Sequence, residues 1–328
     1  MKNGKQAYEV LESLPKSTIL GFYFKSIFIG LWVIAKWLVF LLWNTISQKK
    51  SPGNNHENSD YDGYHDKPPS ILVDNKIGRH SYVKLKGVKL HYVEAGNYGN
   101  PLVLLLHGFP DCWLGWRNQI TELSRFFRVV ALDMKGFNDS DKPIWRQLYS
   151  PKTICEELRQ FIYSLGCSSA TIIGHDIGAV VGWFFAHTNP GNIDRFISVS
   201  APHPNLMWDS LQPKAVINNT WLQFIQLPVI SELDHAVISL RKSVDTNFDA
   251  DFNFNVLDTV NVFYYLNLVF VGNADDRCRL EYMVKSTDFC DNFVVKIIEG
   301  AGHWPHQQVP DEFNKVILNF LVGMSILS

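Results

Sequence analysis

Polar and apolar positions alternate where the folded part of the chain begins and then give way to almost continuous apolar runs. Residues 82–85 and 88–94 alternate around Lys86-Gly87, the pattern of a half-buried β-hairpin. The later runs are residues 102–108, 128–134, 170–176 and 196–202. Strands of this second kind are covered on both faces, so these runs predict a parallel sheet.

Helical spacing fills the intervals between these runs. Within 153–165 the apolar residues Cys155, Leu158 and Phe161 recur every three or four positions, and 177–187 predicts a second helix. Strands that alternate with helices in this way predict an α/β fold with a mostly parallel central sheet flanked by helices.

The same alternation returns near the C-terminus. Residues 266–272 and 293–300 predict two more strands, and 311–321 predicts a closing helix. Between Pro202 and Tyr265 the strand–helix pattern stops. We therefore expect a shortened, mostly helical cap inserted at about 203–265.

The N-terminal region has a different character. Residues 19–43 are apolar apart from a few positions that include Lys25 and Lys36. One lysine near the middle of a span costs about 2.5–3.5 kcal/mol, and the Leu, Ile, Phe and Val residues of 27–43 return roughly 3–7 kcal/mol. No small-residue cleavage site follows, so we expect a retained single-pass anchor within 1–47 that contacts membrane lipid through 19–43.

A helix lying in the membrane interface stays open as an alternative, because Lys25 and Lys36 fall on one helical face. We expect a membrane location, in the endoplasmic reticulum, and the lysines on either side leave the orientation undecided. Residues 48–69 are polar and rich in Asn, Asp, Gly and Pro, which predicts a flexible linker. The folded domain would then occupy 70–328, a suitable length for one α/β domain.

Composition narrows the chemistry. The 328 residues are 46% hydrophobic and 19% charged, which excludes a disordered chain. Lys and Arg number 30 against 32 Asp and Glu, so there is no basic surplus for nucleic acid. The five cysteines show no metal-ligand spacing, and we expect no disulfide framework, no metal and no cofactor.

The third buried run ends in a motif that carries chemistry. Gly174-His175-Asp176-Ile177-Gly178 has the form of the strand–turn–helix nucleophile elbow, with Asp where G-x-S-x-G has Ser. Glycines flank such a turn because its backbone is strained and closely packed. Asp176 is therefore a nucleophile candidate, and the alternative is an ordinary aspartate N-cap.

Three other segments favour the nucleophile. His107-Gly108-Phe109-Pro110 ends the first buried run, where the fold places an oxyanion donor, so we expect the Phe109 and Ile177 amides to form that hole. His303 follows the last strand, and Asp275 with Asp276 follows the strand before it. We favour Asp275 as the acid, although the pattern leaves Asp276 open.

These motifs resemble a known family. HGFPDCWLGWRNQI (107–120), DMKGFNDSDKP (133–143), GHDIGAVVGW (174–183) and GAGHWPHQQVPDEFNKVI (300–317) resemble the epoxide hydrolases of the α/β-hydrolase fold, and with the N-terminal stretch they are most similar to the membrane-anchored epoxide hydrolase 4 subgroup. The resemblance implies that a lipophilic epoxide is hydrolysed to a diol. Asp176 would form an alkyl ester, and His303, oriented by Asp275, would activate the water that cleaves it.

The cap departs from the family pattern. The resemblance implies two cap tyrosines that donate hydrogen bonds to the epoxide oxygen, yet Trp221 stands where the first belongs, and the second is reduced to Tyr264 or Tyr265. Asn138 also replaces a glycine of a G-x-G-x-S turn. We assign the following residues to the substrate pocket or cap: Trp113, Trp221, Tyr265 and Trp304.

Two alternative functions follow from these departures. A membrane-tethered pseudo-hydrolase would keep the core motifs and lack a competent cap. A dehalogenase would use the Trp221 indole N–H to hold a leaving halide, although Ile177 stands where haloalkane dehalogenases usually carry Trp.

Overall fold

The computed structural model describes residues 70–109, 111–143, 146–206, 263–275 and 278–322, together with eight helical positions scattered between 24 and 39. The chain divides into two compact units, of which the first contains Asn75–Leu211 and Val244–Ser328. The sheet and the site described below belong to this first unit. Nearly all of the expected cap, and the linker at 48–69, lie outside the described residues.

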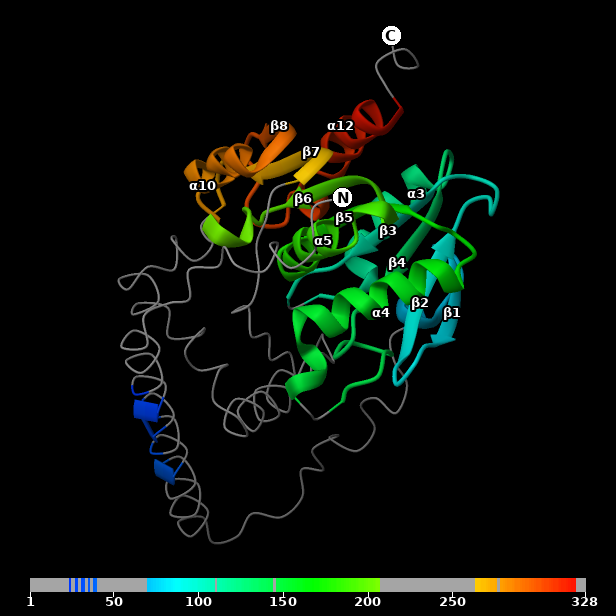
Figure 1. Ribbon diagram of the computed structural model, residues 1–328, viewed down its shortest axis with the longest axis horizontal. Helices are drawn as coiled ribbons and strands as arrows, with labels where there is room; N and C mark the ends of the chain where they lie inside the picture. Colours follow the sequence, from blue (N-terminus) through cyan, green and yellow to red (C-terminus); the bar gives the residue numbers. More distant parts are fainter. Residues whose placement is uncertain are drawn as a thin grey trace, which may run out of the picture. The chain divides into compact units, whose positions relative to one another are not determined.

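An eight-stranded sheet forms the centre of the first unit (Figure 1). Its strand order is β1-β2-β4-β3-β5-β6-β7-β8. The strands are β1 (Arg79–Lys84), β2 (Lys89–Ala95), β3 (Leu102–Leu106), β4 (Arg128–Leu132), β5 (Ala170–His175), β6 (Ile193–Val199), β7 (Phe263–Gly272) and β8 (Cys290–Ile298). The β1–β2 and β2–β4 pairs are antiparallel and all later pairs are parallel, which confirms the predicted hairpin and parallel sheet.

Helices connect these strands. The α-helices of the first unit are α3 (Arg117–Leu123), α4 (Pro151–Ser164), α5 (Ile177–Thr188), α10 (Leu280–Lys285), α11 (Pro305–Gln308) and α12 (Pro310–Val322). Short 3-10 turns include η2 (Trp113–Trp116) and η5 (Ser286–Phe289), and a short helix α2 (Ser70–Val73) belongs to the second unit. Helices α4 and α5 pack together, while α3, α11 and α12 form another group.

The central strands β3, β4 and β5 are buried along their whole length, as their apolar runs predict. Burying one such Leu side chain contributes about 1.5–3 kcal/mol. Helix α5 lies close to the sheet because it carries Gly182: a Cβ there would come within 2.3 Å of the Phe196 ring. The fold therefore fixes the start of α5 against the carboxyl end of β5.

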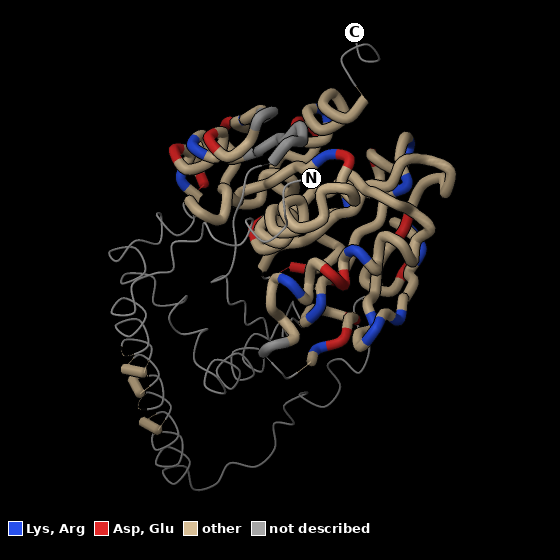
Figure 2. The backbone as a smooth tube through the Cα atoms, viewed as in Figure 1, with Lys and Arg blue, Asp and Glu red and all other residues tan. Residues whose placement is uncertain are grey.

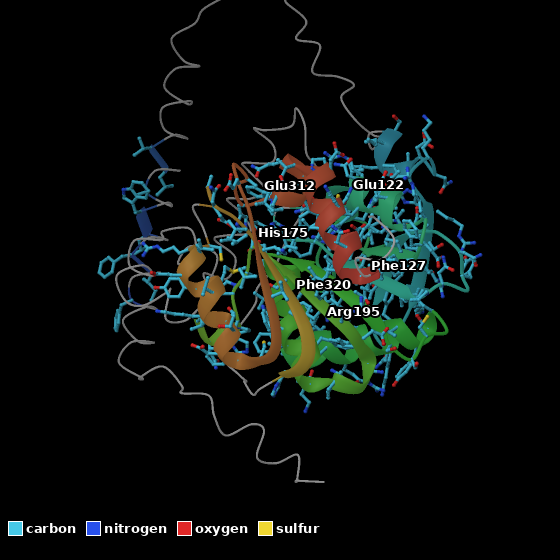
Figure 3. The ribbon with its side chains drawn as sticks, turned by 90° about the horizontal axis from the view of Figure 1, so that it is seen from above. Glu122, Phe127, His175, Arg195, Glu312 and Phe320 are labelled. Atoms are coloured by element: carbon cyan, nitrogen blue, oxygen red, sulfur yellow. The ribbon has the colours of Figure 1, made fainter. Side chains whose placement is uncertain are left out.

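The C-terminal helix is held to the sheet by a side chain of β6. The Arg195 guanidinium donates to the carbonyl of Phe320 at 3.1 Å and also to that of Leu321, and it lies over the Phe320 ring (Figure 3). A cation at the last carbonyls of a helix is favourable because those groups carry the negative end of the helix dipole. Positive and negative side chains are interspersed over the described part of the unit (Figure 2).

Three strands, β6, β7 and β8, each begin three residues before the apolar run that predicted them, β8 at Cys290 rather than at 293. Strand β6 starts at Ile193, three residues before the run at 196–202. The apolar run missed this start because the second and third strand residues, Asp194 and Arg195, are polar. Strand β7 starts at Phe263, so Tyr264 and Tyr265 are strand residues, and the expected end of the cap at 265 falls inside the strand.

The apolar N-terminal stretch is only partly described. Among the described residues, no helix combines the length and the apolar character that a membrane span requires. Most of 19–43 lies outside the described positions. The large side chains that are described there are helical and exposed: Phe24, Ile27, Phe28, Leu31, Trp32, Leu38 and Val39.

Candidate active site

Asp176 occupies a strained turn between β5 and α5. Its backbone has φ 48° and ψ −117°, a conformation that costs a non-glycine residue about 1–3 kcal/mol. The flanking glycines permit the turn: a Cβ on Gly178 would lie 2.3 Å from the Leu106 carbonyl oxygen, and one on Gly174 would lie 2.5 Å from the Gly178 oxygen. The turn therefore has the strained, closely packed strand–turn–helix geometry that the motif predicted.

The Asp176 carboxylate contacts groups from two other elements. The Phe109 backbone N–H, after β3, donates to its Oδ2 at 3.1 Å. On the other side, Nε2 of His303 lies 3.8 Å from Oδ1. The side chain stays 24% exposed, and its own helix receives no capping bond from it. These contacts are those of an accessible nucleophile rather than of an N-cap.

His303 also contacts Asp275, which follows β7. Nδ1 of His303 lies 3.1 and 3.2 Å from the two carboxylate oxygens of Asp275. The Asp275 side chain is fully buried, that of His303 is 3% exposed, and the Cys278 backbone N–H orients the carboxylate from 2.9 Å. Asp275 is thus the partner of His303 in the described part of the chain, and Asp276 lies outside it.

The two carboxylates control the charge of the imidazole between them. Burial lowers the pKa of His303, but the Asp176 and Asp275 carboxylates on either side of the ring outweigh it and raise the pKa to about 9. Burial raises the pKa of Asp176, but the nearby imidazoles of His303 and His175 and the Phe109 N–H lower it overall. At neutral pH the site therefore holds an aspartate beside an imidazolium.

The amides expected for the oxyanion hole lie at two element ends. The Phe109 N–H already contacts Asp176. Ile177 is the first residue of α5, so its N–H has no acceptor within the helix. His107 supports the loop: its Nε2 accepts the Met134 N–H at 3.1 Å, so its Nδ1 is the protonated nitrogen, which donates to the Gly108 carbonyl at 2.8 Å.

His175 has a structural role that the sequence analysis did not predict. It is fully buried at the end of β5, and its Nε2 lies 2.8 Å from the His303 carbonyl oxygen. A carbonyl only accepts, so this nitrogen donates. His175 thus holds the main chain of His303, and its position directly before Asp176 was the only sequence signal of that role.

The residues assigned to the pocket or cap are separated by the fold. Trp304 lies next to His303 with its ring edge-on at 5.0 Å between ring centroids. Trp113 is fully buried in η2, and its ring packs edge-on against His80 of β1. Tyr265 lies near the amino end of β7, whereas Asp275 follows the carboxyl end. Trp221 lies outside the described residues.

Asn138 has φ 38°, a left-handed conformation that agrees with the glycine position inferred from its turn. Its side-chain amide donates to Asp133 at 2.7 Å, so Asn supplies a contact that glycine would lack.

Comparison with known proteins gives one consistent family. Residues 101–224 match the family described as alpha/beta hydrolase fold. The chain is 31% identical over 296 residues to "Epoxide hydrolase 4" of Homo sapiens, covering 77% of this chain and 82% of that protein. It is 28% identical to "Epoxide hydrolase 3" of Xenopus tropicalis, covering 77% and 80% of the two chains.

A solved structure agrees with these relatives. The crystal structure of a Bacillus megaterium epoxide hydrolase in complex with an inhibitor superposes with a TM-score of 0.60 and 26% sequence identity. The match covers 74% of this chain and all of that one (100%).

Proposed function

The chain belongs to the epoxide hydrolase family of the α/β-hydrolase fold, and because Asp176 and His303 face one another in it, we propose that it converts epoxides to diols through a covalent ester on Asp176. The observation that carries the proposal is the pairing of an accessible carboxylate on a strained turn with a buried Asp275–His303 pair. No metal or organic cofactor takes part in the reaction as proposed.

In the first step an Asp176 oxygen attacks an epoxide carbon. The C–O bond to the ring oxygen breaks, an alkyl ester forms, and the ring oxygen takes up a proton from solvent, while the His303 imidazolium, which loses the Asp176 charge beside it, releases one to solvent. The ionised state of Asp176, favoured by its lowered pKa, supplies the nucleophile. We assign the hydrogen bond to the ring oxygen to the cap, where Trp221 stands at the expected position.

In the second step water cleaves the ester. Esterification removes the negative charge of Asp176, so His303 loses one of the two carboxylates that raise its pKa and becomes a base. It takes a proton from water, the hydroxide attacks the ester carbonyl, and the Phe109 and Ile177 amides stabilise the oxyanion. Collapse of this intermediate releases the diol and restores the Asp176 carboxylate.

Mass spectrometry of the full chain with styrene oxide tests both steps. We expect His303→Gln to accumulate an adduct of one substrate mass on Asp176, because the ester forms and is not hydrolysed. Asp176→Ala should carry no adduct and should lose diol formation by more than about 10⁴-fold, as removal of a nucleophile does in other hydrolases.

Asp311→Asn, at an exposed position on α12, is the matched control and should behave as wild type. Diol formation at the same rate by Asp176→Ala would contradict the proposal. A wild-type chain that forms neither adduct nor diol would instead support the pseudo-hydrolase, and halide release from a fluoro- or chloro-acid would support the dehalogenase.

We further propose that residues 19–43 anchor the enzyme in the endoplasmic reticulum membrane and that its substrates are lipophilic. The exposed apolar side chains on the described helical positions, among them Phe28 and Trp32, support a lipid environment. The full chain expressed in cells should resist carbonate extraction, while a chain lacking residues 1–47 should be extracted. Extraction of both forms alike would contradict the anchor.

A further inference from the structure

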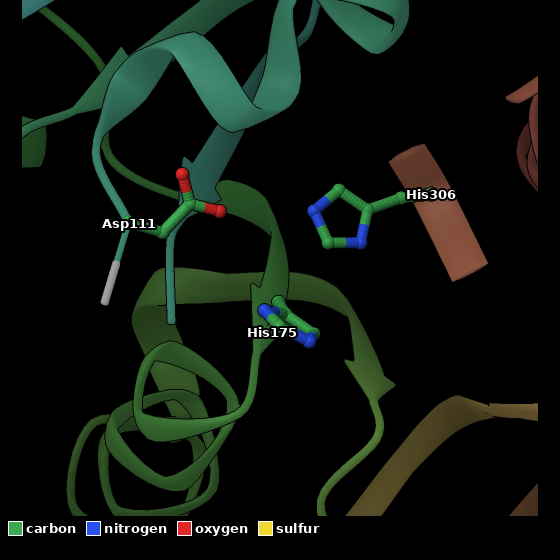
Figure 4. A group of neighbouring side chains, drawn as sticks. All are labelled: Asp111, His175 and His306. Atoms are coloured by element: carbon green, nitrogen blue, oxygen red, sulfur yellow. The ribbon is translucent and has the colours of Figure 1, made fainter. Parts of the chain in front are cut away.

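A buried cluster outside the reaction described above combines two imidazoles with a carboxylate. Asp111 follows β3, His175 ends β5 and His306 lies in α11, and their side chains converge (Figure 4). One potential ligand atom of each lies within 4.8 Å of the others. The three residues are 7%, 0% and 0% exposed, respectively. The cluster is thus a buried group of polar side chains within the hydrophobic interior.

The His175 ring presents an electron pair that has no hydrogen-bond partner among the described residues. Its Nε2 donates to the His303 carbonyl, so in the neutral ring Nδ1 is unprotonated. That Nδ1 is buried and has no hydrogen-bond partner. A ring that donates one nitrogen to a backbone carbonyl while the other nitrogen holds a lone pair is the usual state of a metal-bound histidine.

His306 repeats this feature. Its Nδ1 is buried and has no hydrogen-bond partner among the described residues. Its Nε2 lies 3.4 Å from the Gln307 side-chain nitrogen, a distance close to the upper limit for a hydrogen bond. The ring is fixed by packing on Trp116, with 4.4 Å between ring centroids. The main chain is fixed by Gln119, which donates to the His306 carbonyl at 2.9 Å. The imidazole is therefore positioned in advance of any ligand.

Asp111 is oriented in the same way. One carboxylate oxygen accepts the Cys112 N–H at 2.8 Å, and the other accepts the Gln307 amide at 2.9 Å. The carboxylate lies so close to Gly115 that a Cβ there would come within 2.3 Å of Oδ2. Each oxygen accepts two hydrogen bonds at most, so lone pairs remain for a cation.

Charge also suits a cation at this point. Burial lowers the pKa of His175 to about 4 and that of His306 well below its ordinary value, so both rings are neutral at pH 7. Neutral imidazoles bind metal without first losing a proton. Two imidazoles and one carboxylate are the donor set of Zn²⁺ and related transition metals, whereas Ca²⁺ and Mg²⁺ prefer oxygen alone.

We propose that Asp111, His175 and His306 form a binding site for one divalent transition-metal ion, of the Zn²⁺ or Co²⁺ class. The His175 ring lies 5.1 Å from that of His303, between centroids, and donates to its main chain. Binding of the ion is a property of these three side chains and does not depend on the proposed reaction.

Titration of the untagged full chain in detergent micelles, first stripped with a chelator, tests the site. Co²⁺ should give one equivalent of visible absorption per chain, and Zn²⁺ should displace it and raise the melting temperature. We expect His306→Gln and the nearly isosteric Asp111→Asn each to weaken binding by more than about tenfold, since even residues outside the ligand set change metal affinity by that factor.

His187→Gln is the matched control, because His187 lies in the last turn of α5, about 16 Å along the helix from its start. It should bind Co²⁺ as wild type does. Equal melting temperatures of wild type and His306→Gln in chelator would exclude a folding defect as the cause. Absence of Co²⁺ binding by wild type, or equal binding by wild type and His306→Gln, would overturn the proposal.

The binding site and the proposed reaction are separable in this experiment. Asp176→Ala removes the nucleophile but no ligand, so it should bind Co²⁺ normally. If styrene oxide gives neither adduct nor diol while Co²⁺ binds, the reaction fails and the site stands.

Discussion

Among the described residues, two buried Asp–His pairs lie in or next to the sheet, and their surroundings differ. Asp275 contacts His303 at 3.1 Å beyond the carboxyl ends of β7 and β8. Asp133, just after β4, contacts His91 of β2 at 2.6 Å. Both imidazoles are almost inaccessible to solvent. The pair itself is therefore not what defines the site.

The two pairs differ in what the far nitrogen of each imidazole faces. In His303 it faces the Asp176 carboxylate, which is 24% exposed and can reach a substrate. In His91 it lies 2.9 Å from Nδ1 of His80, and Asp133 also accepts the Trp113 N–H and the Asn138 amide. An Asp–His pair whose every atom is engaged links elements together, whereas one that faces a reactive carboxylate can move protons.

The largest expected difference comes from removing the charge at the catalytic pair. Asp275→Asn should lower diol formation by about 10³–10⁴-fold, because His303 loses the partner that orients it and stabilises its imidazolium. The loss should fall on kcat, measured by single-turnover ester hydrolysis, with unfolding by denaturant changed far less than turnover. An effect confined to KM would contradict the assignment.

Removing the charge at the other pair should affect folding instead. Asp133→Asn breaks a fully buried pair and weakens three contacts at once, which costs about 3–5 kcal/mol of unfolding free energy. Under conditions where the variant stays folded, its kcat and KM should match those of the wild type. A fall in kcat comparable to that of Asp275→Asn would show that the two pairs are functionally coupled.

Much of the catalytic edge could be predicted because its signals are local. Gly174 and Gly178 indicate the strained turn within a stretch of five residues. The apolar runs before His107 and Asp176 predict buried strands that end at these residues. Parallel strands bring their carboxyl ends to one edge, so the motifs after β7 and β8 had to meet the elbow. Sequence order therefore predicted His303 and the adjacent Asp275 and Asp276 at this edge, and the contact in the structure selects Asp275 among the described residues.

Other features depend on contacts between distant segments, which no local pattern records. Asp111, His175 and His306 lie far apart in sequence, and each alone is consistent with an ordinary polar position. The His91–Asp133 pair joins strand β2 of the hairpin to the end of strand β4, and no sequence motif marks either residue as a partner of the other. Tyr265 was assigned to the cap because the family resemblance implies a second cap tyrosine and only Tyr264 and Tyr265 stood nearby, although aromatic residues also suit a strand, where the structure places both.

The pH dependence of stability should separate the two pairs more finely. The pKa of His303 is raised from an unfolded value near 6.5 to about 9, so its stabilising contribution is full below pH 6.5 and is lost as the pH rises through 9. We expect the unfolding free energy of the wild type to fall by at most about 1.4 kcal/mol per pH unit over that interval.

Asp275→Asn should flatten this slope, and Asp133→Asn should leave it unchanged. Denaturant titrations from pH 6 to 9.5 measure both. Below pH 6.5 two other imidazoles affect stability. Burial lowers the pKa of His175 to about 4 and that of His203 to about 3, so the unfolding free energy falls as the pH drops from 6.5 toward these values. A wild-type curve that keeps rising up to pH 9 would show that His303 is neutral in the resting enzyme.

The smallest effect should come from His80, which is hydrogen-bonded to His91 of the His91–Asp133 pair. Its ring is only half-buried, stacks on His91 at 5.1 Å between centroids and shares one hydrogen bond with it. His80→Gln leaves the Asp133 contacts in place, so the cost should be about 1 kcal/mol of unfolding free energy with unchanged kcat.

His80→Gln combined with Asp133→Asn gives the sharper result. If the three side chains form one connected structural unit, the two losses should be non-additive by more than about 0.5 kcal/mol in denaturant titrations. Additive losses would mean that His80 acts only through local packing. The same double substitution should still leave the pH slope assigned to His303 intact, because the imidazole that carries that slope belongs to the other Asp–His pair.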